Sequence, residues 1–127
     1  MPVTPNDFLI IAVDPSSASS EMILRNAISR AYYSGYLHAK QKTHNAGIQL
    51  PSGSGGVHQQ LIKAFELGLC GDVSNGLSTV QQNKIAGLLS MTKHLRTKSD
   101  YKLHLSVNET EKATAIANCQ TIQSLMP

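Results

Sequence analysis

The chain has few cysteines, no long hydrophobic stretch and no basic residue ahead of its first apolar run. Cys70 and Cys119 form neither a CxxC motif nor a Cys/His ligand spacing, so we interpret them as small core residues. The run from Phe8 to Val13 is too short to cross a bilayer. Because Asp7 precedes it without any Lys or Arg, it is also a poor signal peptide. These absences predict a cytoplasmic protein with no membrane partner.

Metal and cofactor motifs are also missing. None of the four histidines at 38, 44, 58 and 94 stands four residues from a carboxylate, as in a zinc-binding helix. The glycine-rich connection at residues 45–57 lacks the Gly-Lys-Ser/Thr ending of a P-loop. We therefore predict no metal site and no cofactor.

Length and composition predict one globular domain over residues 1–127. The sequence is 41% hydrophobic and 15% charged, and 127 residues can bury a core without disulfides or metals. The net charge of +3 is unevenly spread, because a single acid, Asp100, stands among five basic residues between positions 84 and 102. Such a segment either attracts phosphate or forms a solvated helix face. The five are Lys84, Lys93, Arg96, Lys98 and Lys102.

Helical periodicity runs through most of the chain, and no segment shows the strict alternation of a half-buried strand. The clearest helix spans residues 19–44, because one apolar stripe continues along it. Gly35 inside this helix lowers its propensity, which indicates a close approach by another helix at the small residues 27, 31, 34 and 35. The stripe consists of Leu24, Ile28, Ala31, Tyr32, Gly35 and Ala39.

Further helices are predicted on both sides of this one. A short helix at residues 6–13 precedes it, and a helix at 58–69 follows with Leu61, Ile62, Phe65 and Leu69 on one face. Ser78 or Thr79 caps the next, whose core positions are Ile85, Leu88, Leu89, Thr92 and Leu95.

The last helix begins near Asn108, where Glu111 three residues on completes a capping-box pattern. Its apolar side is Ala113, Ile116, Ala117, Cys119, Ile122, Leu125 and Met126. The fold class is therefore all-α, an up-and-down bundle of four long helices with a short N-terminal helix.

Two segments resemble the HEPN (higher eukaryotes and prokaryotes nucleotide-binding) domain family. RNAISRAYYSGYLHAK, residues 25–40, is similar to the long helix of that family, with its Ala-Tyr-Tyr-small-aromatic core. LLSMTKHLRTKSDY, residues 88–101, is similar to a later helix, in which an arginine precedes Ala/Ser-Asp-Tyr. His58 opens the intervening helix as a histidine often does in the family. The resemblance covers roughly residues 19–126.

The resemblance implies a helical homodimer that binds RNA or nucleotides. Many members are metal-independent ribonucleases in toxin-antitoxin, RNA-processing and phage-defence systems, often with a minimal nucleotidyltransferase as partner. Carried over to this chain, the catalytic pair is Arg96 and His104, with Thr97 as the polar neighbour of the arginine. The remaining binding candidates are Lys98, Asp100, Tyr101, Lys102, Arg30 and Tyr33, and for Arg30 the family layout suggests support of Asp100 or Tyr101.

The spacing of the pair departs from the family pattern. Seven residues separate Arg96 from His104, more than is usual in catalytic members. In one continuous helix the two would lie about 80° and about 12 Å apart, too far for one phosphate. If the helix ends near Tyr101, His104 lies on a loop that can fold back. The guanidinium would then hold a phosphate while the imidazole moves a proton of the ribose 2′-hydroxyl.

Simpler interpretations of the same residues stay open. Arg96 pairs with Asp100 on a helix surface in one of them, and His104 is an ordinary loop residue. The tyrosines at 32, 33 and 36 are core or dimer-interface residues, or they stack on bases. Three functions follow: an RNA- or nucleotide-binding protein with endoribonuclease activity as an open extension, a non-catalytic nucleotidyltransferase partner, or a structural dimerisation module.

Overall fold

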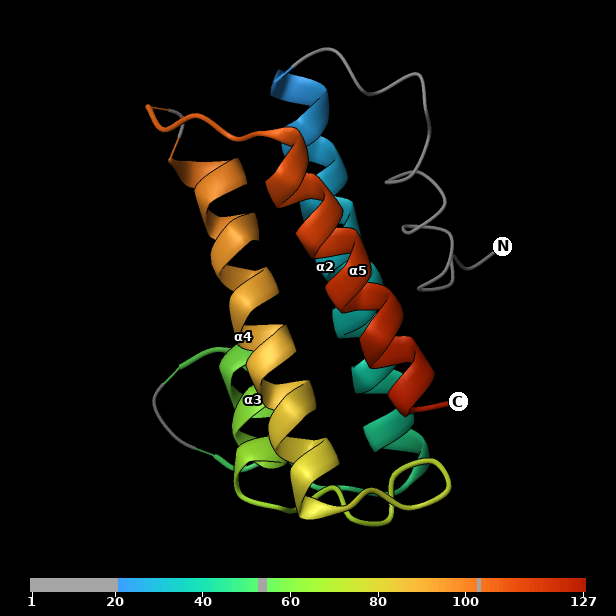
Figure 1. The fold of residues 1–127 in the computed structure, drawn as a ribbon. Helices are drawn as coiled ribbons and strands as arrows, with labels where there is room; N and C mark the ends of the chain where they lie inside the picture. The colour runs from blue at the N-terminus through green and yellow to red at the C-terminus, as the bar shows by residue number, and fades with distance from the viewer. Residues whose placement is uncertain (1–20, 53–54, 103) are drawn as a thin grey trace, which may run out of the picture.

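The computed structural model describes residues 21–52, 55–102 and 104–127, and all regular structure in these ranges is helical. The helices are α2 (Glu21–Asn45), α3 (Val57–Glu66), α4 (Thr79–Tyr101) and α5 (Glu109–Leu125). In Figure 1, α2, α4 and α5 run alternately down, up and down, and the shorter α3 lies beside the lower half of α4. The prediction of an all-α bundle is confirmed. The helix predicted at residues 6–13 lies outside the described residues.

Two helix starts follow the predicted capping chemistry. Ser78 accepts a hydrogen bond from the backbone N–H of Gln81, whose side chain in turn accepts one from the backbone N–H of Ser78. Asn108 and Glu111 form the same reciprocal pair at the start of α5. Each box satisfies two backbone donors that a helix start otherwise leaves open. Helix α4 then continues to Tyr101, which places His104 beyond its end.

The apolar stripe of α2 is buried along its whole length, as predicted. At Gly35 an added Cβ would lie 3.7 Å from the backbone Cα of Cys119 and 3.5 Å from Ile122, so α5 packs closely there. Ala27, Ala31 and Ser34 are buried as well. This small-residue surface is therefore used for packing of α5 on α2 within the chain.

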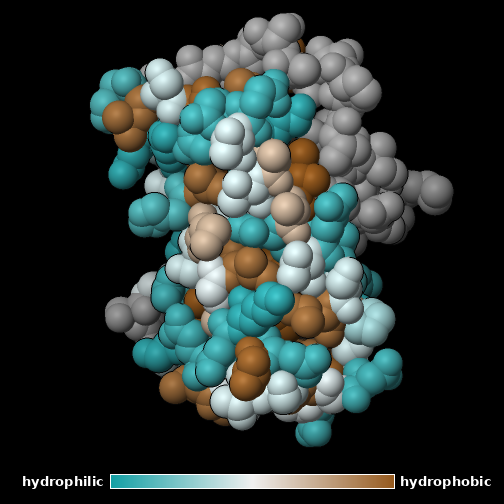
Figure 2. Space-filling view, viewed as in Figure 1, coloured by the Kyte–Doolittle hydropathy of each residue, from teal (hydrophilic) through white to brown (hydrophobic). Residues whose placement is uncertain are grey.

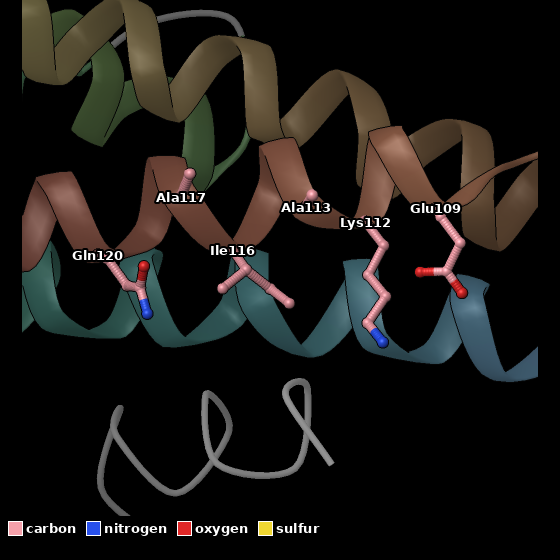
Figure 3. Close-up of a pocket in the computed structure, with 6 residues that line it drawn as sticks. All are labelled: Glu109, Lys112, Ala113, Ile116, Ala117 and Gln120. Carbon is pink, nitrogen blue, oxygen red and sulfur yellow. The ribbon is translucent and has the colours of Figure 1, made fainter. Parts of the chain in front are cut away.

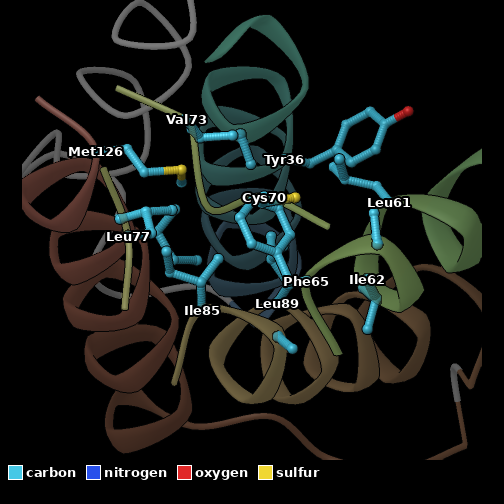
Figure 4. Packing of buried hydrophobic residues seen from close by; sticks show 14 of the residues in the cluster. Tyr36, Leu61, Ile62, Phe65, Cys70, Val73, Leu77, Ile85, Leu89 and Met126 are labelled. Atoms are coloured by element: carbon cyan, nitrogen blue, oxygen red, sulfur yellow. The ribbon is translucent and has the colours of Figure 1, made fainter. Parts of the chain in front are cut away.

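The larger of the two buried apolar clusters lies in the lower half of the bundle, in the orientation of Figure 1. Side chains from α2, α3 and α4 meet there with the loop after α3 and the C-terminal end (Figure 4). Both cysteines are buried and free, as the core interpretation required. Burial raises the pKa of the Cys70 thiol to about 11 and also raises that of Cys119. The labelled core residues are Tyr36, Leu61, Ile62, Phe65, Cys70, Val73, Leu77, Ile85, Leu89 and Met126.

The predicted end of α3 is wrong by one turn. The helix stops at Glu66, because Gly68 adopts a left-handed φ of 75° that ends the helical path. Leu69, predicted on the apolar face, is 43% exposed.

The predicted apolar face of α5 is confirmed at Cys119, Ile122 and Met126, which are buried, but it is wrong at two alanines. Ala115, Cys119 and Ile122 are its buried residues, whereas Ala113 and Ala117 are exposed. The exposed alanines line an outer pocket of about 330 Å³, together with Glu109, Lys112, Ile116 and Gln120 (Figure 3). Figure 2 shows the α4–α5 face, on which hydrophobic and hydrophilic side chains are interspersed.

Candidate functional site

Aromatic side chains of α2 and α3 form a stacked group between the helices. Tyr32 and Tyr36 stand one turn apart on α2, with ring centroids 6.0 Å apart. The imidazole of His58, in the first turn of α3, stacks on Tyr36 at 3.9 Å and 20°. Tyr33 contacts the other rings edge-on. Tyr32 and Tyr36 are buried and belong to the core, as the sequence favoured.

The guanidinium of Arg96 lies against this aromatic group from α4. Its central carbon is 5.3 Å from the ring of Tyr32, 5.4 Å from that of Tyr33 and 5.8 Å from that of Tyr101. Such distances allow cation–π attraction. Arg96 is 9% exposed, whereas Tyr101 is 71% exposed. We call Arg96 with Tyr32, Tyr33, Tyr36, His58, Asp100 and Tyr101 the Arg96 cluster.

Polar partners of Arg96 are few for a buried cation. Its Nη1 is 3.6 Å from a carboxylate oxygen of Asp100, the predicted pairing four residues on, and Ser29 donates a hydrogen bond to the same oxygen. The Nε atom is buried and makes no hydrogen bond. A guanidinium has five N–H donors, and burying such a charge without partners costs free energy. The Arg96 cluster therefore leaves hydrogen-bonding capacity for an anion.

The charges around the ring of His58 are also positive, and the pKa of the imidazole is lowered. Burial lowers the pKa of His58 first, and the nearby charges of Arg96, Lys93 and Lys40 lower it further. The Nδ1 atom shares a hydrogen bond with the hydroxyl of Tyr32. Burial raises the pKa of Tyr32 well above its usual range, although Arg96 acts in the opposite direction. Three cations from two helices thus surround a neutral imidazole and a protonated phenol.

A second buried arginine, Arg25, belongs to α2, and its side chain lies against the C-terminal end of α4. Its guanidinium donates to the backbone carbonyls of Lys98, Ser99, Lys102 and Leu105. Because the last carbonyls of a helix lack partners and carry the negative end of its dipole, a cation there is stabilising. Arg25 therefore fixes the end of α4 and the chain that follows.

The other predicted site residues divide into two groups. Thr97, Lys98 and Lys102 line a separate pocket of about 360 Å³, where Lys98 pairs with Glu111 at 2.7 Å. Asp100, Tyr101 and Tyr33 lie in the Arg96 cluster. Among the described residues, no hydrogen bond or ion pair joins Arg30 to Asp100, and Ser29 contacts that carboxylate instead.

His104 follows α4 in an exposed turn. The backbone of its neighbour Leu105 bonds to Arg25 and to Lys102. Within the described part of the chain, no hydrogen bond or ring contact links His104 to Arg96. His58 is the histidine that the fold brings to the Arg96 cluster, although the two stand far apart in sequence.

His58 and Arg25 were not predicted as site residues from the sequence. His58 follows the glycine-rich segment, and its partner Tyr32 is 26 residues earlier, so only the packing of α3 on α2 joins them. Arg25 lies inside RNAISRAYYSGYLHAK, next to the apolar stripe. Its position beside the apolar stripe of α2 was the one local pattern that could have indicated a buried arginine.

No protein-family model, no curated protein and no solved structure matches this chain. Across residues 21–52, 55–102 and 104–127, no helix combines the length and apolar character needed to span a membrane. The same ranges contain no cluster of three or more His, Cys, Asp or Glu side chains suited to a metal ion. The site has to be interpreted from its own chemistry.

Proposed function

We propose that the protein binds RNA or a nucleotide at the Arg96 cluster, with a phosphate on the guanidinium of Arg96. The observation that carries this proposal is the poor pairing of that guanidinium. It is 9% exposed, its Nε makes no hydrogen bond, and its one carboxylate contact is 3.6 Å long. Because Nε itself is buried, a phosphate oxygen would accept hydrogen bonds from the terminal Nη groups of the guanidinium.

The surroundings favour nucleotides over other anions. Proteins that bind single-stranded nucleic acid combine backbone-tracking cations with aromatic rings on which bases stack. Here Lys40 and Lys93 add positive charge beside Arg96, and the exposed ring of Tyr101 lies within 5.8 Å of the guanidinium. A base stacked on Tyr101 would place its own phosphate near Arg96.

The wider setting in this proposal comes from the resemblance to HEPN domains. It comprises a cytoplasmic homodimer that acts in a toxin-antitoxin or phage-defence system. A minimal nucleotidyltransferase is the proposed protein partner. In the alternative without catalysis, the chain serves that enzyme as a binding partner through the same surface.

Metal-independent RNA cleavage is a second candidate function. The observation that favours it is the end of α4 at Tyr101, which frees His104 from the helix geometry that would hold it about 12 Å along the axis from Arg96. Cleavage would need an imidazole at the phosphate that Arg96 holds.

Binding of a single-stranded oligouridylate tests the main proposal. We expect Arg96→Met to lower the affinity by roughly tenfold to a hundredfold, because charged hydrogen bonds to the phosphate are lost. Fluorescence anisotropy of a labelled oligonucleotide measures this, and gels of the same samples in EDTA report cleavage.

Lys84→Met is the matched control, since it removes an exposed positive charge elsewhere on α4. Equal affinities of the wild-type and Arg96→Met proteins would contradict the proposal. Cleavage that is no stronger in the wild type than in Arg96→Met would exclude the ribonuclease version.

A further inference from the structure

The ring of His58 is held in one orientation by two tyrosines of α2. It stacks on Tyr36 at 3.9 Å, and its Nδ1 shares a hydrogen bond with the hydroxyl of Tyr32. Because Nδ1 is taken, Nε2 is the ring nitrogen left for a ligand. His58 is also partly exposed, so a ligand can reach it from the surface.

Positive charge faces this imidazole from both helices packed against it. Helix α2 contributes Lys40 beside the three tyrosines, and α4 contributes Arg96 and Lys93. All three cations disfavour the imidazolium. Among the described residues that act on the pKa of His58 there is no carboxylate. Positive charge therefore dominates next to His58, while Asp100, the carboxylate of the Arg96 cluster, lies against Arg96.

The start of helix α3, next to His58, also lacks negative charge. Its N-cap is Gly56, which offers no side-chain hydrogen bond, and its first turn contains no acidic residue. The first N–H groups of a helix attract anions when no cap occupies them. Arg96 and His58 both contact the rings of Tyr32 and Tyr33, so an anion at the guanidinium would also lie near the imidazole.

We propose that His58 is the second phosphate-contacting group of the Arg96 cluster and takes up one proton from solvent when a phosphate binds. The identity of the ligand as RNA or nucleotide rests on the proposed function. The neutral imidazole and the solvent proton give an imidazolium, whose Nε2–H donates to a phosphate oxygen. No bond to phosphorus forms or breaks.

The direction of the pH dependence follows from the charges. In the free protein, burial and three cations keep the pKa of His58 below its ordinary value. A bound anion offsets the cations and favours the charged ring, so the pKa rises in the complex. Affinity therefore increases as the pH falls from above the pKa of the complex towards that of the free protein.

Histidine ring signals in NMR spectra of the wild-type protein test the proton uptake directly. Inorganic sulfate is the probe, because it stays a dianion between about pH 5 and about pH 8. We expect saturating sulfate to raise the pKa of His58 by about 1. The ring signals of His44, exposed near the C-terminal end of α2, should not respond to sulfate. An unchanged pKa of His58, or a response of His104 in its place, would overturn the inference.

A pH series of oligouridylate binding is the second test. His58→Phe keeps a ring on Tyr36 but cannot titrate. The wild-type affinity should rise by about tenfold more than that of His58→Phe as the pH falls from about 8 to about 5. Parallel profiles of the two proteins would overturn the inference.

The experiments distinguish failure of the proposed function from failure of the proposed role of His58. If Arg96→Met loses RNA binding while sulfate leaves His58 unchanged, the proposed function stands and the role of His58 falls. If sulfate shifts His58 but the wild-type protein binds no RNA or nucleotide, an anion site remains and its assignment to nucleic acid falls.

Discussion

The surroundings of the two buried arginines, Arg25 and Arg96, differ in how completely they satisfy a charge. Arg25 is 6% exposed and donates to four backbone carbonyls at the end of α4. Arg96 is 9% exposed and has aromatic rings on several sides, one distant carboxylate and an unpartnered Nε. The two side chains are buried to a similar degree. They differ in the number of hydrogen-bond partners that their guanidinium groups have.

This difference separates a structural from a functional role. A fully bonded cation stabilises the fold, because its removal leaves several buried carbonyls without a donor. A cation short of partners stabilises little and can even be destabilising compared with an apolar side chain. In the proposed function, Arg96 is the cation that is kept ready for a ligand.

Arg25→Met should produce the largest change in stability. We expect the free energy of unfolding to fall by about 2 to 3 kcal/mol, because charged hydrogen bonds to the end of α4 are lost. Denaturant unfolding followed by circular dichroism measures it. Arg30→Met on the same helix is the matched control, with an expected change within about 0.5 kcal/mol. If Arg25→Met and Arg30→Met lost similar amounts of unfolding free energy, Arg25 would have no special role in stabilising the end of α4.

Asp100→Asn should have a smaller effect on stability and the opposite effect on binding. The carboxylate is the anion that Arg96 holds in the free protein, at 3.6 Å. Its loss costs about 0.3 to 0.5 kcal/mol of helix pairing and removes repulsion of an incoming phosphate. We expect oligouridylate affinity to rise by roughly threefold to tenfold, measured by anisotropy. Weaker binding would mean that Asp100 contacts the ligand favourably.

Local sequence patterns were enough for most of the helical framework. Asn108 with Glu111 marked the start of α5 because a capping box involves neighbours only. The stripe of α2 also identified its buried face. On α5 the buried alanine was missed, because alanines at 113, 115 and 117 leave that part of the apolar face poorly defined by periodicity. The early end of α3 depends on the backbone of Gly68.

The site was predictable only in part. Arg96, Asp100, Tyr101 and Tyr33 were identified from two short segments, and the structure brings them together. The contribution of His58 depends on how α3 packs across α2 and α4, which no local pattern encodes. Arg25 was not singled out in the sequence, because its role depends on its tertiary partners, the backbone carbonyls at the end of α4.

The central claim is that Arg96 is held for an anionic ligand and contributes little to the fold. Its most direct test is the free energy of unfolding of Arg96→Met, measured by denaturant titration without ligand beside wild type and Arg25→Met. The account predicts that Arg96→Met stays within about 1 kcal/mol of wild type or exceeds it, far from the loss in Arg25→Met. A destabilisation of Arg96→Met as large as that of Arg25→Met would contradict the account.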